Sequence, residues 1–190
     1  MRTAAQYPIR WYGYGMHAPT RRMIAGTARL KSTMFSNDWR LASAGQVLAT
    51  MRRHPRQFVT EVATIDGDRW LLEPDGEGIV NLVSSDNPRV ASITRRSLFG
   101  RRWDLESPSF AYQLISHPRP RRWHIAVGGT PVAEINGSLV SYNTVSIESN
   151  LGVPLAVAVM AWNVIARPWE VAARPRGIRA VPEPQVQEKP

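Results

Sequence analysis

The sequence predicts a mainly β protein in which hairpins follow one another along the chain and a single apolar helix comes last. The first observation is a repeated unit. A tryptophan stands two residues before a branched apolar residue, and a second apolar stretch follows after a gap of turn-forming residues. Each unit therefore predicts a strand, a tight turn and a returning strand. The second observation is one apolar run, Val153–Ala166, after the last hairpin. The four units begin at Trp39–Leu41, Trp70–Leu72, Trp103–Leu105 and Trp123–Ile125.

Between Ala28 and Glu148 the chain divides into about twelve short strand-like runs. Several runs alternate apolar and polar residues, and the residues that join them favour turns. Asn136–Gly137, between two apolar runs, predicts a type I′ hairpin turn because both residues tolerate a positive φ. Regularly spaced short strands are typical of an antiparallel barrel or sandwich. The predicted strands are 28–35, 38–42, 46–51, 58–65, 69–73, 79–84, 89–95, 101–106, 110–115, 121–126, 131–135 and 138–147.

Val153–Ala166 is apolar on every side, which is typical either of a membrane-spanning helix or of a helix buried in a protein core. A bilayer span needs about 20 apolar residues, whereas a run of ~10–14 is more typical of a core helix. This run is close to the shorter length, contains Asn163 and is followed at once by Arg167. We therefore expect a core helix and keep a membrane anchor as the alternative.

The remaining segments set the predicted domain boundaries. Residues 1–27 are rich in aromatic residues, glycine and arginine without a sustained period, so we expect an irregular arm. Ser149 or Asn150 is predicted to cap the helix, which would span about 152–173. The barrel domain would then cover 28–173, and the proline-rich residues 174–190 predict a disordered tail.

The chain is strongly basic, with a formal net charge of +9 over 190 residues. Such a charge favours nucleic acid or an anionic membrane surface as a partner. All but two of the 24 basic residues are arginine, which is also the signature of a GC-rich genome, so the positions of the arginines must carry the argument. The absence of cysteine excludes disulfides and thiolate metal sites. Residues 1–16 do not resemble a secretory signal, and we expect a cytoplasmic protein, peripheral to the membrane if lipid is the partner.

About twelve antiparallel strands followed by one hydrophobic helix resemble the tubby C-terminal-like superfamily, in particular its LURP-one-related and phospholipid-scramblase-like branch. The likeness covers roughly residues 28–173 and rests on the order of the elements, the Trp-x-Leu strands and return strands such as Val132–Ile135. It implies a twelve-stranded barrel closed around a central apolar helix formed by Gly152–Ala166. Tubby domains bind phosphoinositide headgroups through basic residues, and scramblase-like members are linked to membranes and calcium, so the resemblance also implies an anionic lipid partner.

Motifs for catalysis are missing: the chain has neither Gly-x-Ser-x-Gly, nor a P-loop pattern, nor His-Glu-x-x-His. We therefore expect no enzyme activity, no cofactor and no metal site. The histidines lie far apart in sequence, and the acidic pairs that could bind calcium coincide with predicted hairpin turns, which favours turn chemistry. These residues are His17, His54, His117 and His124, and the pairs Asp66 with Asp68 and Asp75 with Glu77.

One candidate binding site follows from counting the strands. In an up-and-down meander, alternate connections fall at the same end of the barrel, and three arginine-rich connections share one end in this count, together with the Asp75 turn. Guanidinium groups around a barrel mouth would attract phosphates or carboxylates and suit bidentate contacts. The alternative is that these are ordinary solvated residues at strand ends. The candidate anion-binding residues are Arg52, Arg53, Arg56, Arg95, Arg96, Arg101, Arg102, Arg119, Arg121 and Arg122.

Three function classes follow. The leading hypothesis is a non-enzymatic binding or scaffold module whose basic rim engages a phospholipid headgroup or an acidic protein. The second is a nucleic-acid-binding protein that uses the arginine surface and the aromatic N-terminal arm, with tryptophans stacking on bases. However, each tryptophan of the repeated units lies two residues before Leu41, Leu72, Leu105 or Ile125, so the two side chains share one face of the strand. This alternation predicts that the tryptophans face the core. The third is an enzyme with polar groups that converge at the barrel mouth.

Overall fold

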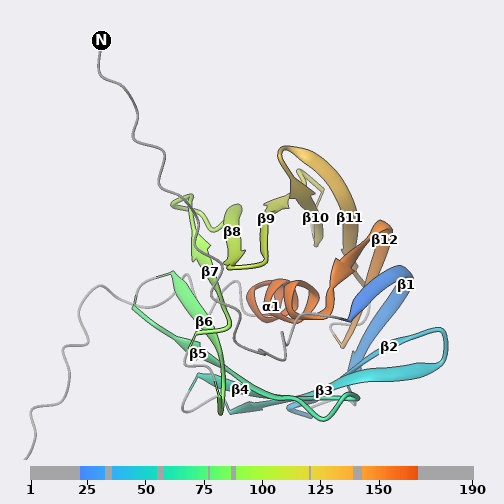
Figure 1. Cartoon of the computed structure of the whole chain (residues 1–190). Coiled ribbons are helices and arrows are strands. Elements are labelled where there is room, and N and C mark those ends of the chain that lie inside the picture. Colours follow the sequence, from blue (N-terminus) through green and yellow to red (C-terminus); the bar gives the residue numbers. More distant parts are fainter. Residues whose placement is uncertain are drawn as a thin grey trace, which may run out of the picture.

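Twelve antiparallel strands form a closed barrel in the computed structural model of the chain (Figure 1). The structure describes residues 22–32, 36–54, 58–76, 78–86, 89–119, 121–138 and 143–166. Each strand pairs with the next one along the chain, and β1 pairs with β12 to close the barrel. The strands are β1 Met23–Ser32, β2 Asp38–Ser43, β3 Gln46–His54, β4 Val59–Thr64, β5 Arg69–Pro74, β6 Ile79–Ser84, β7 Ala91–Arg95, β8 Arg102–Ser107, β9 Phe110–Ser116, β10 Arg122–Val127, β11 Thr130–Gly137 and β12 Thr144–Pro154.

Alternating side chains along the strands build the inner wall of the barrel. Trp39, Trp70 and Trp103 are buried, as are the leucines two residues after them. Trp123 is half-buried and packs against the same core. Successive side chains of a strand point to opposite faces, so these pairs share the inner face. The prediction that these four tryptophans pack in the core is confirmed.

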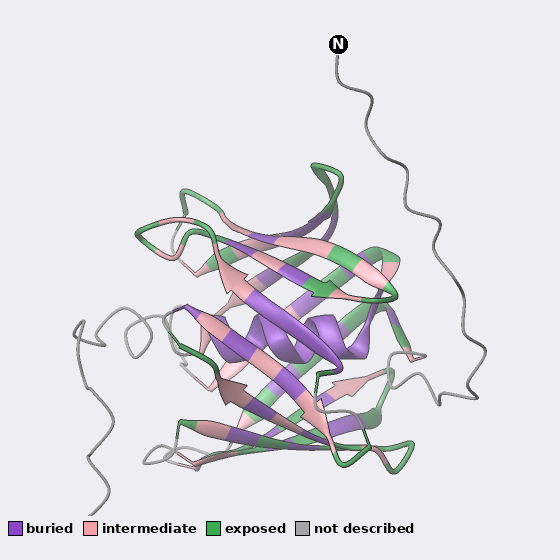
Figure 2. Cartoon of the chain, turned by 60° about the vertical axis from the view of Figure 1, so that its left-hand side comes forward, coloured by how far each residue is buried: buried purple, intermediate pink, exposed green. Residues whose placement is uncertain are grey.

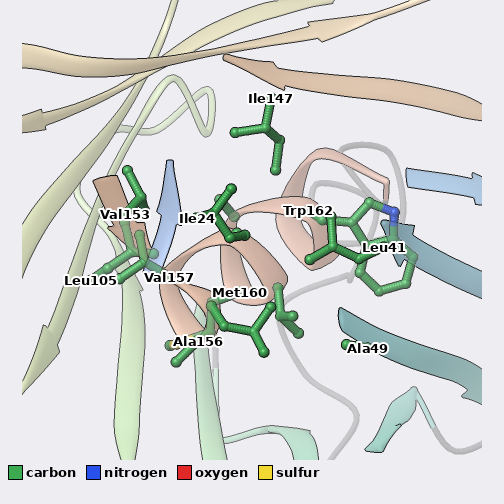
Figure 3. Packing of buried hydrophobic residues seen from close by; sticks show 14 of the residues in the cluster. Ile24, Leu41, Ala49, Leu105, Ile147, Val153, Ala156, Val157, Met160 and Trp162 are labelled. Atoms are coloured by element: carbon green, nitrogen blue, oxygen red, sulfur yellow. The ribbon is translucent and has the colours of Figure 1, made fainter. Parts of the chain in front are cut away.

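Helix α1 (Leu155–Ile165) lies inside the barrel, where every residue from Leu155 to Val164 is buried (Figure 2). Its side chains form one hydrophobic cluster with those of the inner wall, including Leu41 of β2 and Leu105 of β8 (Figure 3). This confirms the predicted mainly β fold with a barrel closed around one helix. In the part of the chain that is described, no helix combines the length and the apolar content needed to cross a bilayer.

The first strand begins at Met23, so the predicted boundary between an irregular arm and the barrel at Ala28 is wrong. Ile24 faces the core and pairs with Val153 of β12. A shift in register between Ile24 and Gly26 interrupts the alternation of side chains, which conceals this part of the strand in the sequence. Residues 1–21 of the expected arm lie outside the described residues.

The predicted helix cap is also wrong, because β12 continues to Pro154. Ser149 is buried in that strand, and its hydroxyl donates to the carbonyl oxygen of Val132 at 3.5 Å. The helix begins at Leu155, directly after the strand, and Pro154 occupies the position before the first turn, where a missing N–H is tolerated. The described helix ends at Ile165; its expected extension to residue 173 and the expected tail lie outside the described residues.

The expected turn at Asn136–Gly137 does not form there. Both residues belong to β11, where they pair with Ser146 and Val145 of β12. The glycine is explained by a close approach instead: a Cβ at position 137 would lie 2.9 Å from Nε of Arg121. An Asn-Gly pair signals a turn only when the glycine is needed for a positive φ, and here it makes room for a side chain.

The two ends of the barrel differ in the connections they carry, since neighbouring strands run in opposite directions. We call the end with the β1–β2, β3–β4, β5–β6, β7–β8, β9–β10 and β11–β12 connections the arginine rim, and the other end the opposite rim. Because β12 runs from the arginine rim to the opposite rim, α1 starts at the opposite rim and returns. Its last turns lie near the arginine rim, where Trp162 contacts Trp39 with ring centroids 5.3 Å apart.

Candidate functional site

The meander assumed in counting the strands is the observed topology, and nine of the ten candidate arginines lie at the arginine rim. The tenth, Arg56, lies outside the described residues. Position alone does not make an arginine available to a ligand. A guanidinium group paired with a carboxylate forms an ion pair without net charge, which attracts an anion only weakly. The partners of each side chain separate the nine into those with structural roles and those that are free.

Two of the nine are neutralised by carboxylates on neighbouring strands. Nε of Arg52 donates to Asp38 at 2.9 Å, and Nε of Arg96 donates to Asp104 at 2.6 Å. Nη2 of Arg96 also lies 4.0 Å from Glu106. In each case the side-chain hydrogen bond to the aspartate raises the pKa of the arginine above its ordinary value. These pairs lie on the outer wall and hold adjacent strands together.

Three further arginines, all half-buried, interact with other parts of the chain. Arg95 packs over Gly78, where an added Cβ would lie 2.9 Å from Cβ of Arg95, and Arg121 packs over Gly137 in the same way. Arg53 is half-buried, and all three make further interactions. These three side chains therefore already interact within the protein, and we do not count them among the arginines available to a ligand.

The remaining four have no side-chain partner among the described residues and are exposed to solvent. They occupy three neighbouring strand ends. Arg101 accepts a backbone hydrogen bond from Ser116 of β9 at 2.8 Å, and the amide of His117 donates to the carbonyl of Arg122 at 2.8 Å. Arg119 lies in the turn between β9 and β10, and its backbone amide donates to Nδ1 of His117 at 3.1 Å. We call Arg101, Arg102, Arg119 and Arg122 the arginine cluster.

The β7–β8 loop places two large apolar side chains directly before this cluster. Leu98 is 83% exposed and Phe99 is 87% exposed, the highest values among the large hydrophobic residues that are described. We call these two residues the apolar tip. Burial of apolar surface is the main favourable term in folding, so such side chains are rarely left in water in pairs unless they meet a partner.

Backbone hydrogen bonds fix the shape of the loop. The hydroxyl of Ser97 accepts from the amides of Arg101 at 2.7 Å and Arg102 at 3.0 Å. The amide of Gly100, which has φ +64°, donates to the carbonyl of Ser97 at 3.0 Å. Nε1 of the buried Trp103 donates to the carbonyl of Gly100 at 2.7 Å. These hydrogen bonds fix the turn, and the turn presents the apolar tip to solvent.

Sequence reasoning found the arginines of the site but missed the apolar tip. The signal was present: Leu98–Phe99 stands between Ser97 and Gly100, and arginines flank that segment on both sides. A two-residue apolar run of this kind is too short for a strand and falls in a predicted connection, where apolar residues are not expected. Reading the connection for its apolar content as well as its charge would have identified the pair.

Two of the acidic residues considered as calcium ligands interact with other side chains. Asp66 pairs with Arg22 at 2.7 Å, and Asp75 accepts from the side-chain amide of Asn81 at 2.8 Å. Nε2 of the half-buried His54 lies 3.2 Å from a carboxylate oxygen of Glu61 on the neighbouring strand. Within the described ranges, no three His, Asp or Glu side chains gather in a way that could hold a metal ion.

A separate basic surface lies on the outer wall of β1 and β2. A groove of about 1000 Å³ there is lined in part by Arg29, Lys31 and Arg40. Lys31 and Arg40 are directly opposite each other across the two strands, a like-charge pair that repels. This surface lacks an exposed apolar element comparable with the tip, and it offers a matched set of charges against which the arginine cluster can be tested.

Comparison with protein-family models, curated proteins and solved structures finds no match to this chain.

Proposed function

We propose that the chain is a non-enzymatic binding module whose arginine cluster engages an anionic partner, either a phospholipid headgroup or an acidic protein. The observation that carries this proposal is the cluster itself: four exposed guanidinium groups on adjoining strand ends, with no carboxylate or other side-chain partner among the described residues. Each group retains its full charge and its bidentate geometry for phosphate or carboxylate oxygens. We also propose a peripheral association with membranes, should lipid be that partner.

The barrel architecture supports a proposed relationship with the tubby C-terminal-like superfamily. Twelve antiparallel strands closed around one buried apolar helix are the fold that this resemblance implies. The relationship makes an anionic lipid a natural partner, but the four arginines carry the functional proposal independently of it.

A soluble multiphosphate tests the cluster without any membrane. We expect inositol hexakisphosphate to bind the wild-type protein in isothermal titration calorimetry. Changing Arg101, Arg102, Arg119 and Arg122 to Gln should weaken binding by about tenfold or more, because each exposed ion pair contributes up to ~1 kcal/mol and 1.4 kcal/mol corresponds to tenfold. Affinity should fall with added salt as exposed charges are screened.

The matched control removes the same amount of charge elsewhere. Arg29, Lys31, Arg40 and Arg69 are exposed, lack side-chain partners among the described residues and lie outside the cluster. The variant with these four changed to Gln should bind nearly as well as the wild type. Equal weakening of both variants would mean that only net charge matters, and a loss confined to the control would move the site to the control residues on β1, β2 and β5. Either result contradicts the proposal, as does an absence of binding.

Nucleic acid is the competing polyanion and is tested in the same two variants. Binding to single- or double-stranded DNA should be weak and should disappear steeply with salt, since non-specific binding depends on the release of counterions. Tight DNA binding that the cluster variant abolishes, with no binding of inositol hexakisphosphate, would favour the nucleic-acid alternative.

A further inference from the structure

We propose that the apolar tip, Leu98 and Phe99, inserts into an acidic phospholipid bilayer while the arginine cluster binds the headgroups around it. This inference rests on the proposed function and deepens it, because it names a membrane surface as the partner of the rim. Four observations carry it: the exposure of the tip, the tied loop that presents it, the charges that adjoin it and their position at one end of the barrel.

Exposure singles out the tip from the other apolar side chains of the surface. Leu98 and Phe99 are adjacent in sequence and are 83% and 87% exposed. Leu151, at 74%, is the next most exposed large hydrophobic residue that is described, and it lies at the opposite rim with no arginine cluster beside it. A leucine and a phenylalanine together supply enough apolar area for a measurable gain on leaving water.

The loop presents the tip at little entropic cost. The two backbone amides bound to Ser97 and the indole of Trp103 bound to Gly100 hold the turn in one shape. A loop that is ordered before binding does not lose that conformational freedom when it binds. Trp103 is itself buried in the barrel wall, so the tip is fastened directly to the core.

The charges beside the tip match an acidic bilayer. Arg101 and Arg102 follow the loop directly, and the β9–β10 connection with Arg119 and Arg122 adjoins them through the hydrogen bonds of Ser116 and His117. Basic residues near an anionic membrane are attracted to it, and stable membrane association generally combines an apolar element that enters the bilayer with a basic element that binds the headgroups. Both elements are present on one rim.

An acidic protein fits the same surface less well. It could pair with the arginines, but it would need an apolar pocket placed directly beside its carboxylates to receive two protruding side chains. A bilayer supplies that arrangement everywhere on its surface, with phosphates and carboxylates in the headgroup layer and hydrocarbon beneath them. The combination of a protruding tip and surrounding cations therefore favours lipid.

The absence of cysteine makes insertion directly measurable. Leu98→Cys can carry a single environment-sensitive nitrobenzoxadiazole label, and Leu151→Cys at the opposite rim is the matched control. With vesicles of phosphatidylcholine and phosphatidylserine, we expect the label at 98 to brighten, shift to the blue and be quenched by lipids with spin labels in their acyl chains. The label at 151 should stay as it is in water, and phosphatidylcholine alone should change neither.

Affinity gives the second measurement. Leu98→Ser with Phe99→Ser should weaken sedimentation with the acidic vesicles by about tenfold or more, while binding of inositol hexakisphosphate stays unchanged. The remaining vesicle binding should become more sensitive to salt, since only exposed charges support it. Met23→Ser with Leu151→Ser, which removes exposed apolar residues from the opposite rim, should bind vesicles as the wild type does.

The two probes separate failure of this inference from failure of the proposed function. If inositol hexakisphosphate binds through the cluster but the label at 98 reports water on the vesicles, or the serine variant binds them like the wild type, insertion is refuted and the anion site stands. If neither probe binds the wild-type protein, both proposals fail. If acidic vesicles bind only through the opposite rim, the membrane-facing end assigned here is wrong.

Discussion

At the scale of single residues, two different needs place glycine in this barrel. Gly76 and Gly78 lie in the β5–β6 connection with φ of +79° and +74°, a region that L-residues with a Cβ rarely adopt. Gly137 has no positive φ and leaves room for the side chain of Arg121, which packs against it. A sequence does not distinguish these causes, which is why Asn136–Gly137 predicted a turn at a place where β11 continues.

Gly78 combines both needs, and Gly76 isolates one of them. An added Cβ would meet nothing within 4 Å at position 76, but at position 78 it would lie 2.9 Å from Cβ of Arg95, an atom that the strand holds in place. We expect Gly76→Ala to lower the free energy of unfolding by about 1–2 kcal/mol, through φ alone. Gly78→Ala should cost ~1–3 kcal/mol more through overpacking. Urea denaturation of the two variants measures the difference; equal losses would show that the contact with Arg95 is not tight.

At the scale of elements, the apolar run after the last strand predicted the helix and its burial, because only a core tolerates an apolar surface on all sides over so short a length. Its ends were not predictable in the same way. Pro154 suits the first turn of a helix, yet it is also compatible with the end of β12, and the pairing of Pro154 with Met23 decides for the strand. The start of β1 was not predictable from local sequence either, because Met23 and Ile24 pair with β12, far along the chain.

Trp162 is the element-scale test of how firmly α1 fills the barrel. Its ring is fully buried against Trp39, and its Nε1–H has no acceptor among the described residues. Trp162→Ala should lower the free energy of unfolding by about 3–5 kcal/mol through the cavity it leaves. Trp162→Phe should cost much less, because it keeps an aromatic ring and removes a buried donor that forms no hydrogen bond. Chemical denaturation followed by circular dichroism checks both; equal costs would indicate that the indole N–H is satisfied in solution.

At the scale of the whole molecule, a count of strands was enough to assign the arginine-rich connections to one end, because a closed meander leaves no freedom in which end each connection occupies. The count could not select the four arginines of the cluster from the nine candidates that the structure describes. That selection depends on which carboxylate each side chain reaches across the wall, as Arg96 reaches Asp104 and Arg52 reaches Asp38, and such contacts require coordinates. The apolar tip depends in the same way on the tied turn that faces it outward.

Closure itself can be tested on the strand that completes the barrel. Arg29 points outward from the middle of β1, paired with Ala42 of β2 on one side and Ser146 of β12 on the other. A closed barrel has no edge strand on which proline is tolerated, so Arg29→Pro must break a ladder hydrogen bond whichever neighbour the amide faces. Because all twelve strands share one core with α1, we expect the whole barrel to melt at a lower temperature in a single transition, coincident by far-ultraviolet circular dichroism and by tryptophan fluorescence.

Arg29→Ala removes the same exposed side chain but keeps the amide, and it should melt close to the wild type. Two separate transitions in the proline variant would mean that the β1 seam opens independently, and the rim would then lose the rigid frame on which the arginine cluster and the apolar tip depend.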